Sequence, residues 1–165
     1  MRLYKVVLLM LLLNPLSVFA SYHEDYNDGH DSYTSGDYKA AYSIWLESAE
    51  SGNMYSQYGL AILFSRGHGV LKNDDKSLDW LWKSARQGFI RAQYSLAVFF
   101  IRKGGKYGKG NPTSFNYRVA KRYLEKAYNN DDASQAGLEE YQIKAEELYN
   151  KEEMWQYQDL KNPDL

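Results

Sequence analysis

A basic, glycine-rich stretch between residues 102 and 110 is the first place where this sequence could do chemistry. It reads Arg-Lys-Gly-Gly-Lys-Tyr-Gly-Lys-Gly and carries four cations. Glycine-rich loops bind phosphate or carboxylate groups through backbone N–H groups and nearby cations. The Walker spacing, Gly-x-x-x-x-Gly-Lys-(Ser/Thr), fits no register here. Two interpretations remain: an elongated, mobile, solvated turn, or a loop that binds an acidic protein surface through Arg102, Lys103, Lys106, Tyr107 and Lys109.

The three histidines are the residues best suited to acid–base or metal chemistry, but the sequence gives them no partners. His23 and His30 lie among carboxylates, where they could hold a metal ion weakly. We expect that segment to be a disordered acidic terminus instead. His68 stands in a Gly-His-Gly-Val turn, and a catalytic base would need a nucleophile and an orienting acid nearby. The sequence offers no such set, so we predict no enzymatic activity, no cofactor and no metal site.

A second candidate site consists of aromatic and aliphatic residues that recur 36 positions apart. At 100° per residue they fall on the helix face opposite to the one that carries Leu96. Tyrosine offers a large contact area with a polar tip, and it is enriched where proteins bind each other. The same spacing is also typical of a second core layer. This face is therefore either a partner-binding surface or part of the interior, and its residues are Gln57, Tyr58, Ile62, Gln93, Tyr94 and Val98.

The elements that must position these residues are helices of a repeat. Residues 56–64, Ser-Gln-Tyr-Gly-Leu-Ala-Ile-Leu-Phe, return at 92–100 as Ala-Gln-Tyr-Ser-Leu-Ala-Val-Phe-Phe. A fixed period of this length is typical of a solenoid, in which each unit buries its apolar face on the next. We predict an all-α fold, an α/α solenoid over residues 36–130 with a C-terminal capping helix and tail over 131–165. The tail would draw its apolar side from Tyr141, Leu148, Tyr149 and Trp155.

These residues match a known pattern. Ser56, Leu60, Ala61 and Phe64, then Gly-His-Gly-Val at 67–70, an Asp at 74 or 75, and Trp-Leu-Trp-Lys-Ser-Ala at 80–85 resemble the Sel1-like repeat. A second copy keeps Ala92, Leu96, Ala97 and Phe100 and the Tyr-Leu-Glu-Lys-Ala run at 123–127, but it departs at the turn. The resemblance implies an α/α solenoid, related to tetratricopeptide repeats, that serves as an adaptor or scaffold. Many exported bacterial members act in envelope or secretion systems.

The start of the chain and its charge indicate where the protein works. Arg2 and Lys5 precede an apolar run, and Val-Phe-Ala at 18–20 offers a cleavage site, so residues 1–20 are predicted to be a secretory signal peptide. The run is too short for a stable membrane anchor. We expect the exported chain, most simply periplasmic but alternatively secreted, to begin with a flexible acidic N-terminus over 21–35.

The charge of the exported chain is divided. Residues 38–130 carry 15 basic and six acidic side chains, whereas residues 131–165 carry ten acidic and three basic ones. Either the acidic ends fold back and neutralise the repeat body, or the body presents a positive surface to an acidic protein. Nucleic acid is excluded as a partner by export.

We therefore expect an exported, non-enzymatic scaffold that binds another protein. Short signal-peptide-bearing Sel1-like proteins resemble periplasmic immunity proteins that neutralise phospholipase effectors of type VI secretion systems, and this is one specific expectation. The alternative is an envelope protein that binds glycans or lipid headgroups through its basic loop and tyrosines.

Overall fold

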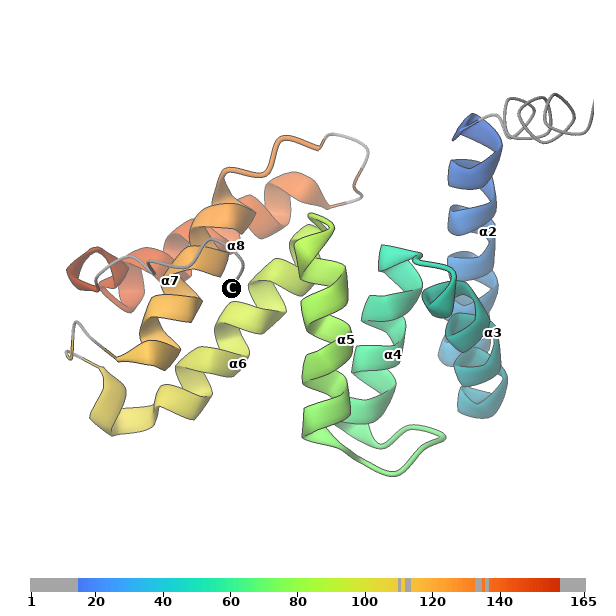
Figure 1. Ribbon diagram of the computed structural model, residues 1–165, viewed down its shortest axis with the longest axis horizontal. Helices are drawn as coiled ribbons and strands as arrows, with labels where there is room; N and C mark the ends of the chain where they lie inside the picture. The colour runs from blue at the N-terminus through green and yellow to red at the C-terminus, as the bar shows by residue number, and fades with distance from the viewer. Residues whose placement is uncertain (1–14, 110, 112–113, 133–134, 136, 158–165) are drawn as a thin grey trace, which may run out of the picture. The chain divides into compact units, whose positions relative to one another are not determined.

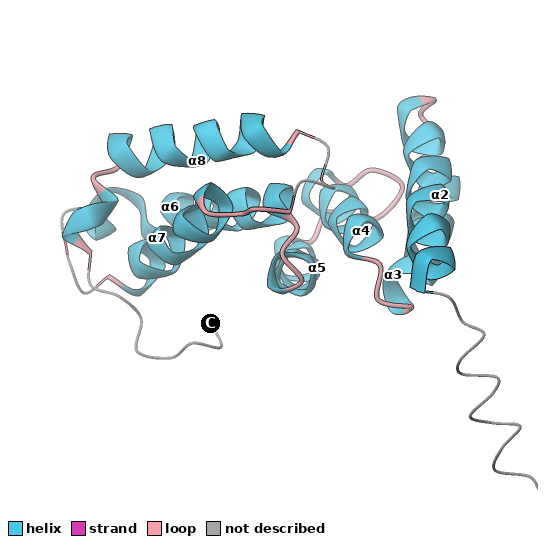
Figure 2. Ribbon diagram, turned by 90° about the horizontal axis from the view of Figure 1, so that it is seen from above, coloured by secondary structure: helices cyan, strands magenta, loops and turns pink. Residues whose placement is uncertain are grey.

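The computed structural model describes residues 15–109, 111, 114–132, 135 and 137–157, and the regular structure within them is entirely helical (Figures 1 and 2). The predicted all-α class is confirmed. The helices are α2 (Pro15–Thr34), α3 (Tyr38–Glu50), α4 (Met54–Arg66), α5 (Asp74–Arg86), α6 (Ile90–Gly108), α7 (Phe115–Tyr128), α8 (Leu138–Lys151) and the short 3-10 helix η1 (Met154–Gln156). The chain divides into two compact units, residues 1–73 and 74–165. Within each unit, helices that follow one another in the chain pack together, as in a helical repeat.

One tryptophan joins the three helices of the first unit. Trp45 of α3 is 3% exposed, and its indole ring lies against Gly29 of α2 and Gly59 of α4. A Cβ at either glycine would overlap the ring. The indole N–H donates a hydrogen bond of 3.1 Å to the carbonyl oxygen of Tyr26. The two glycines are therefore the reason why α2 and α4 can approach Trp45 from both sides.

Polar caps and glycines set the ends of these helices. The Asp37 carboxylate accepts from the N–H of Ala40 at the start of α3. The buried Asn53 side chain caps α4 in the same way, since its Oδ1 accepts from Tyr55 N–H at 2.9 Å. Gly67, with φ 72°, ends α4 in the left-handed conformation that favours glycine. The turn predicted at residues 67–70 therefore begins where glycine can adopt a backbone conformation that other residues rarely adopt.

The prediction of a flexible N-terminus over residues 21–35 is wrong, because α2 extends through Thr34 and packs on α3 and α4. Tyr26, Gly29 and Tyr33 recur at spacings of three and four and face the partner helices. The Tyr26 ring lies 6.0 Å from that of Trp45 and 5.8 Å from that of Tyr55. The acidic side chains that made the segment look disordered are mostly exposed; these are Glu24, Asp28 and Asp31.

In the second unit, α6 packs against α5, α7 and α8. Leu96 of α6 and Leu124 of α7 are completely buried. Gly104 lies against the ring of Tyr117, where a Cβ would stand 2.6 Å from Cδ2 of the tyrosine. Glycine allows this close approach, and α6 continues as a helix to Gly108, through most of the segment that was predicted to be a turn or loop.

The predicted C-terminal capping helix is α8, which lies alongside α6 and α7 (Figure 2). After it, η1 brings Met154 and Tyr157 into the interior, and the Tyr157 ring stacks on that of Tyr117 at 4.9 Å. Trp155 is 58% exposed, so the expectation that it supplies the apolar side of the tail is wrong. The chain reverses direction there, and Met154 and Tyr157 fill that role instead.

Candidate functional site

Gln57 and Gln93, predicted at the edge of an open face, lie in the interior. Each is 5% exposed. The Gln57 amide donates to the carbonyl oxygen of Ala49 at 3.1 Å, and the Gln93 amide donates to that of Ala85 at 3.4 Å. Both glutamines thus satisfy a carbonyl in the last turn of the preceding helix, at the same place in successive repeats. The prediction that they contact a partner is wrong, because their amides hold neighbouring helices together.

The four apolar residues of that face are half-buried, and the structure divides them between the units. Tyr58 and Ile62 belong to the first unit, and Tyr94 and Val98 belong to the second. The Tyr94 ring meets the ring of Tyr141 on α8 edge to face at 5.6 Å. The capping helix therefore covers this part of α6, which favours the core interpretation for Tyr94.

The basic, glycine-rich segment is a helix through Gly108, so the prediction of an extended mobile turn is wrong. Interior N–H groups of a helix already bond to carbonyls four residues earlier and cannot cradle an anion. Arg102 and Lys103 are exposed, and the Lys103 ammonium lies 5.6 Å from the centroid of the Phe99 ring. The side chains of Lys106 and Tyr107 lie outside the described residues.

Lys109 makes an ion pair with Glu152, which follows α8, at 3.4 Å. This contact joins a cation of the repeat body to a carboxylate of the acidic tail. It agrees locally with the interpretation that the ends fold back and neutralise the body.

A group of cations and rings that sequence reasoning missed lies where α5 faces α7. We call it the basic–aromatic cluster; it consists of Trp82, Arg86, Arg122, Tyr123 and Lys126. The rings of Trp82 and Tyr123 meet edge to face at 5.2 Å. The Arg86 guanidinium carbon lies 5.4 Å from the Trp82 centroid, and the Lys126 ammonium lies 4.8 Å from the Tyr123 centroid.

The charges of the cluster act on one another. Burial lowers the pKa of Lys126, and the nearby Arg122 and Arg86 cations lower it further. Burial raises the pKa of Tyr123, and the same two arginines partly offset that rise. Arg86 and Lys126 are 40 positions apart in the sequence. No local pattern in the sequence signals their encounter, because it depends on how α5 and α7 pack.

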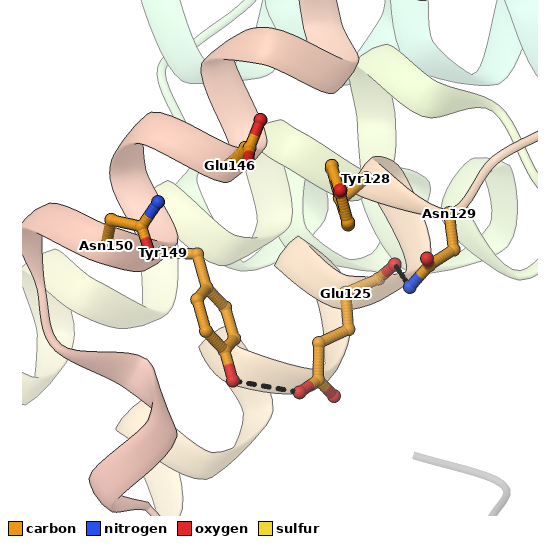
Figure 3. A pocket seen from close by; sticks show the side chains of 6 residues that line it. All are labelled: Glu125, Tyr128, Asn129, Glu146, Tyr149 and Asn150. Atoms are coloured by element: carbon orange, nitrogen blue, oxygen red, sulfur yellow. Dashed lines mark hydrogen bonds between the residues drawn. The ribbon is translucent and has the colours of Figure 1, made fainter.

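A cleft of about 410 Å³ opens between α7 and α8 (Figure 3). The Tyr149 hydroxyl donates to Glu125 at 3.2 Å across it, and the Asn129 amide donates to the Glu125 carbonyl oxygen at 2.8 Å. Tyrosine rings, amides and carboxylates suit neutral polar ligands, whereas two glutamates repel anions. The lining residues are Glu125, Tyr128, Asn129, Glu146, Tyr149 and Asn150.

His68 packs among aromatic rings. Its ring stacks on that of Tyr38 at 4.3 Å and lies 5.7 Å from that of Tyr33. Among the described residues, His, Cys, Asp and Glu side chains nowhere gather in a group of three or more that could hold a metal ion. None of the described helices is both long and apolar enough to cross a bilayer.

Comparison with known proteins adds one finding. The family described as the Sel1 repeat matches residues 55–89 and again residues 90–132. The two matches cover α4 with α5 and α6 with α7, so each repeat is one helix pair. No curated protein and no solved structure matches the chain significantly.

Proposed function

Because this chain is a Sel1-repeat protein, and such proteins are generally non-enzymatic scaffolds for protein interaction, we propose that it is an exported scaffold that binds another protein in the cell envelope. The observation that carries the proposal is the pair of adjacent Sel1 repeats. The polar residues that recur in the two repeats, Gln57 and Gln93, join helices to one another, which leaves the exposed helix surfaces to bind a partner.

The placement of α2 is compatible with export. The residues that pack α2 against the rest of the first unit are Tyr26, Gly29 and Tyr33, and all follow the expected cleavage position after Ala20. Removal of residues 1–20 would therefore leave the packing contacts in the exported chain. Sequencing the N-terminus of the protein isolated from the periplasm tests this step: a start at Ser21 supports export, and a start at Met1 in the cytosol contradicts it.

Within this class we propose that the chain is a periplasmic immunity protein that neutralises a phospholipase effector of a type VI secretion system. A solenoid presents a long surface, which suits the occlusion of an enzyme's active site. The test is to delete the gene and compete the strain against its parent, and to add the purified protein to the phospholipase encoded beside it. Killing of the deletion strain and stoichiometric inhibition support the immunity role. Unchanged survival and undiminished lipase activity contradict it, and leave the scaffold role to be judged by partner capture.

The cleft between α7 and α8 favours a second candidate, an envelope protein that binds glycans. Tyr128 is 46% exposed beside two asparagines and two glutamates, and these groups can stack on a sugar and bond to its hydroxyls. Glu125 and Glu146 disfavour the phosphate of a lipid headgroup. Calorimetric titration with soluble cell-wall fragments separates the candidates: saturable binding that Tyr128→Ala abolishes supports the glycan function, and no heat of binding rules it out.

A further inference from the structure

We propose that the basic–aromatic cluster on α5 and α7 is a docking site for an acidic segment of the partner protein, one that presents two or more carboxylates beside an apolar residue. The inference rests on the proposed scaffold function and names the part of the surface that performs it. The cluster lies within the second unit, so it requires no particular placement of the two units.

The geometry of the cluster is that of a prepared anion site. Arg86 and Lys126 are exposed, and each cation lies over the face of a ring from its own helix. Trp82 is held between the rings of Tyr123, at 5.2 Å, and Phe100, at 5.8 Å, in edge-to-face contacts. Rigid aromatic side chains and arginine are the residue types that carry most binding energy at protein interfaces. Tyr123 is completely buried and Trp82 is half-buried, so Trp82 is the ring that a partner can touch. Because Trp82 is already packed, its contact with a partner costs little side-chain entropy.

The cluster gathers three positive charges from two helices. Arg122 and Lys126 stand four residues apart on α7, a spacing at which like charges destabilise a helix. Arg86 adds a third positive charge from α5; partial burial is the main cause of the lowered pKa of Lys126, and the two arginines lower it further. Carboxylates from a partner would be attracted by all three charges.

The partner chemistry follows from the number and setting of the charges. Basic patches that bind anionic membranes typically gather about four to eight Lys and Arg side chains on flexible stems. Here three cations surround two packed rings, and the acidic cleft between α7 and α8 lies on the neighbouring face of α7. A compact acidic protein segment with an apolar contact fits that setting better than an extended anionic surface.

The test uses the full exported chain and a fluorescein-labelled helical peptide with glutamates at i, i+4 spacing beside leucines. Fluorescence anisotropy is measured for the wild type, for Arg86→Gln/Lys126→Gln, and for the control Lys39→Gln/Lys151→Gln. The control removes the same charge from two exposed lysines outside the cluster. Circular dichroism establishes that each variant is folded. The comparison probes are the same peptide with glutamine in place of glutamate, and vesicles of phosphatidylglycerol.

We expect the cluster variant to bind the glutamate peptide about tenfold or more weakly than the wild type at about 50 mM salt, with the difference shrinking at about 300 mM. The control variant should bind like the wild type, and the glutamine peptide should not bind. Any of four results would overturn the proposal. Both variants could bind the peptide equally weakly, the cluster variant could bind like the wild type, the wild type could fail to bind, or cluster-dependent binding could be tighter to the vesicles than to the peptide. If the cluster variant still captures the natural partner, the docking site is wrong and the scaffold function stands; if the wild type captures no partner, the scaffold function itself fails.

Discussion

The glycines around Trp45 allow a sharp test of how the first unit is held together. A Cβ at Gly59 would stand 2.5 Å from Cδ2 and 2.6 Å from Cε3 of the indole, whereas non-bonded carbons prefer about 3.5–4.0 Å. The ring would have to withdraw by about 1 Å. It cannot do so, because Gly29 of α2 lies against the same ring and offers no free space.

Overpacking a core costs about 1–3 kcal/mol, and alanine stabilises a helix by about 1 kcal/mol relative to glycine. Because the ring is blocked on both sides, the overpacking cost should lie in the upper part of that range, at about 2–3 kcal/mol. We therefore expect Gly59→Ala to lower the free energy of unfolding by about 1–2 kcal/mol. The next repeat has Leu81 and Ser95 at the positions of Trp45 and Gly59. The next repeat therefore combines a smaller core residue with a side chain at the position of Gly59, which indicates that leucine leaves room for a Cβ there. In a Trp45→Leu background, Gly59→Ala should therefore be neutral or stabilising by up to about 1 kcal/mol.

The assay is urea unfolding of the wild type, the two single variants and the double variant, followed by circular dichroism at 222 nm. In the two variants that carry Trp45→Leu, all remaining tryptophans lie in the second unit, so their fluorescence reports whether that unit unfolds in the same transition. The double-mutant cycle should give a coupling energy of about 1–3 kcal/mol. A coupling near zero, or stabilisation by Gly59→Ala in the wild type, would refute the close contact of Trp45 with Gly59.

Three further predictions follow from burial and charge. Met154→Ala should lower the free energy of unfolding by about 2–5 kcal/mol, because Met154 is fully buried. Trp155→Ala should change it by less than about 0.5 kcal/mol, because that side chain is 58% exposed. Equal effects of the two variants in urea unfolding would contradict the placement of η1. Leu96→Ala should likewise cost about 2–5 kcal/mol, and Tyr94→Ala should cost less, because it loses mainly one ring contact with α8; a thermal melt in which Tyr94→Ala is the worse variant would disprove this order. The pKa of Lys126 is lowered in the folded protein, so the charged lysine opposes folding at neutral pH and this penalty disappears as the pH rises towards the unfolded pKa. Lys126→Met should therefore stabilise the protein at neutral pH and lose this advantage in alkaline buffer. An advantage that grows with pH in urea titrations would show the sign to be wrong.

The helices of the repeats could be predicted from the sequence because their signals are local. The Asn53 cap and the glycine after α4 mark the helix ends of the first repeat within a few residues. The left-handed glycine that precedes the repeated helix, Gly52, returns at the period of 36 as Gly88. The N-terminal helix was missed because its aromatic face, Tyr26 and Tyr33, is interrupted by acidic residues whose composition imitates disorder. In the same way, Gly104 signals a loop by composition, and only the Tyr117 ring from another helix shows why a glycine belongs inside α6.

The candidate site could be predicted less well, because surface and interior differ by contacts that no repeat pattern records. Gln57 looks like an exposed polar residue until the carbonyl of Ala49 is placed beside it. The basic–aromatic cluster depends on α5 and α7 lying together, and its members are separated by about 40 positions. Sequence periodicity establishes which residues form helices, whereas their side-chain partners follow from how these helices pack.

Site-specific photo-crosslinking in living cells that express the protein tests the central claim most directly. A photoreactive amino acid replaces exposed Lys83, one turn from Arg86 in the cluster, and in a second strain it replaces exposed Glu47 in the first unit. We predict that irradiation gives one discrete protein adduct from position 83, which mass spectrometry identifies and which Arg86→Gln/Lys126→Gln removes. A glycan or lipid adduct, or no adduct from either position, would contradict a scaffold that binds an acidic protein through this surface.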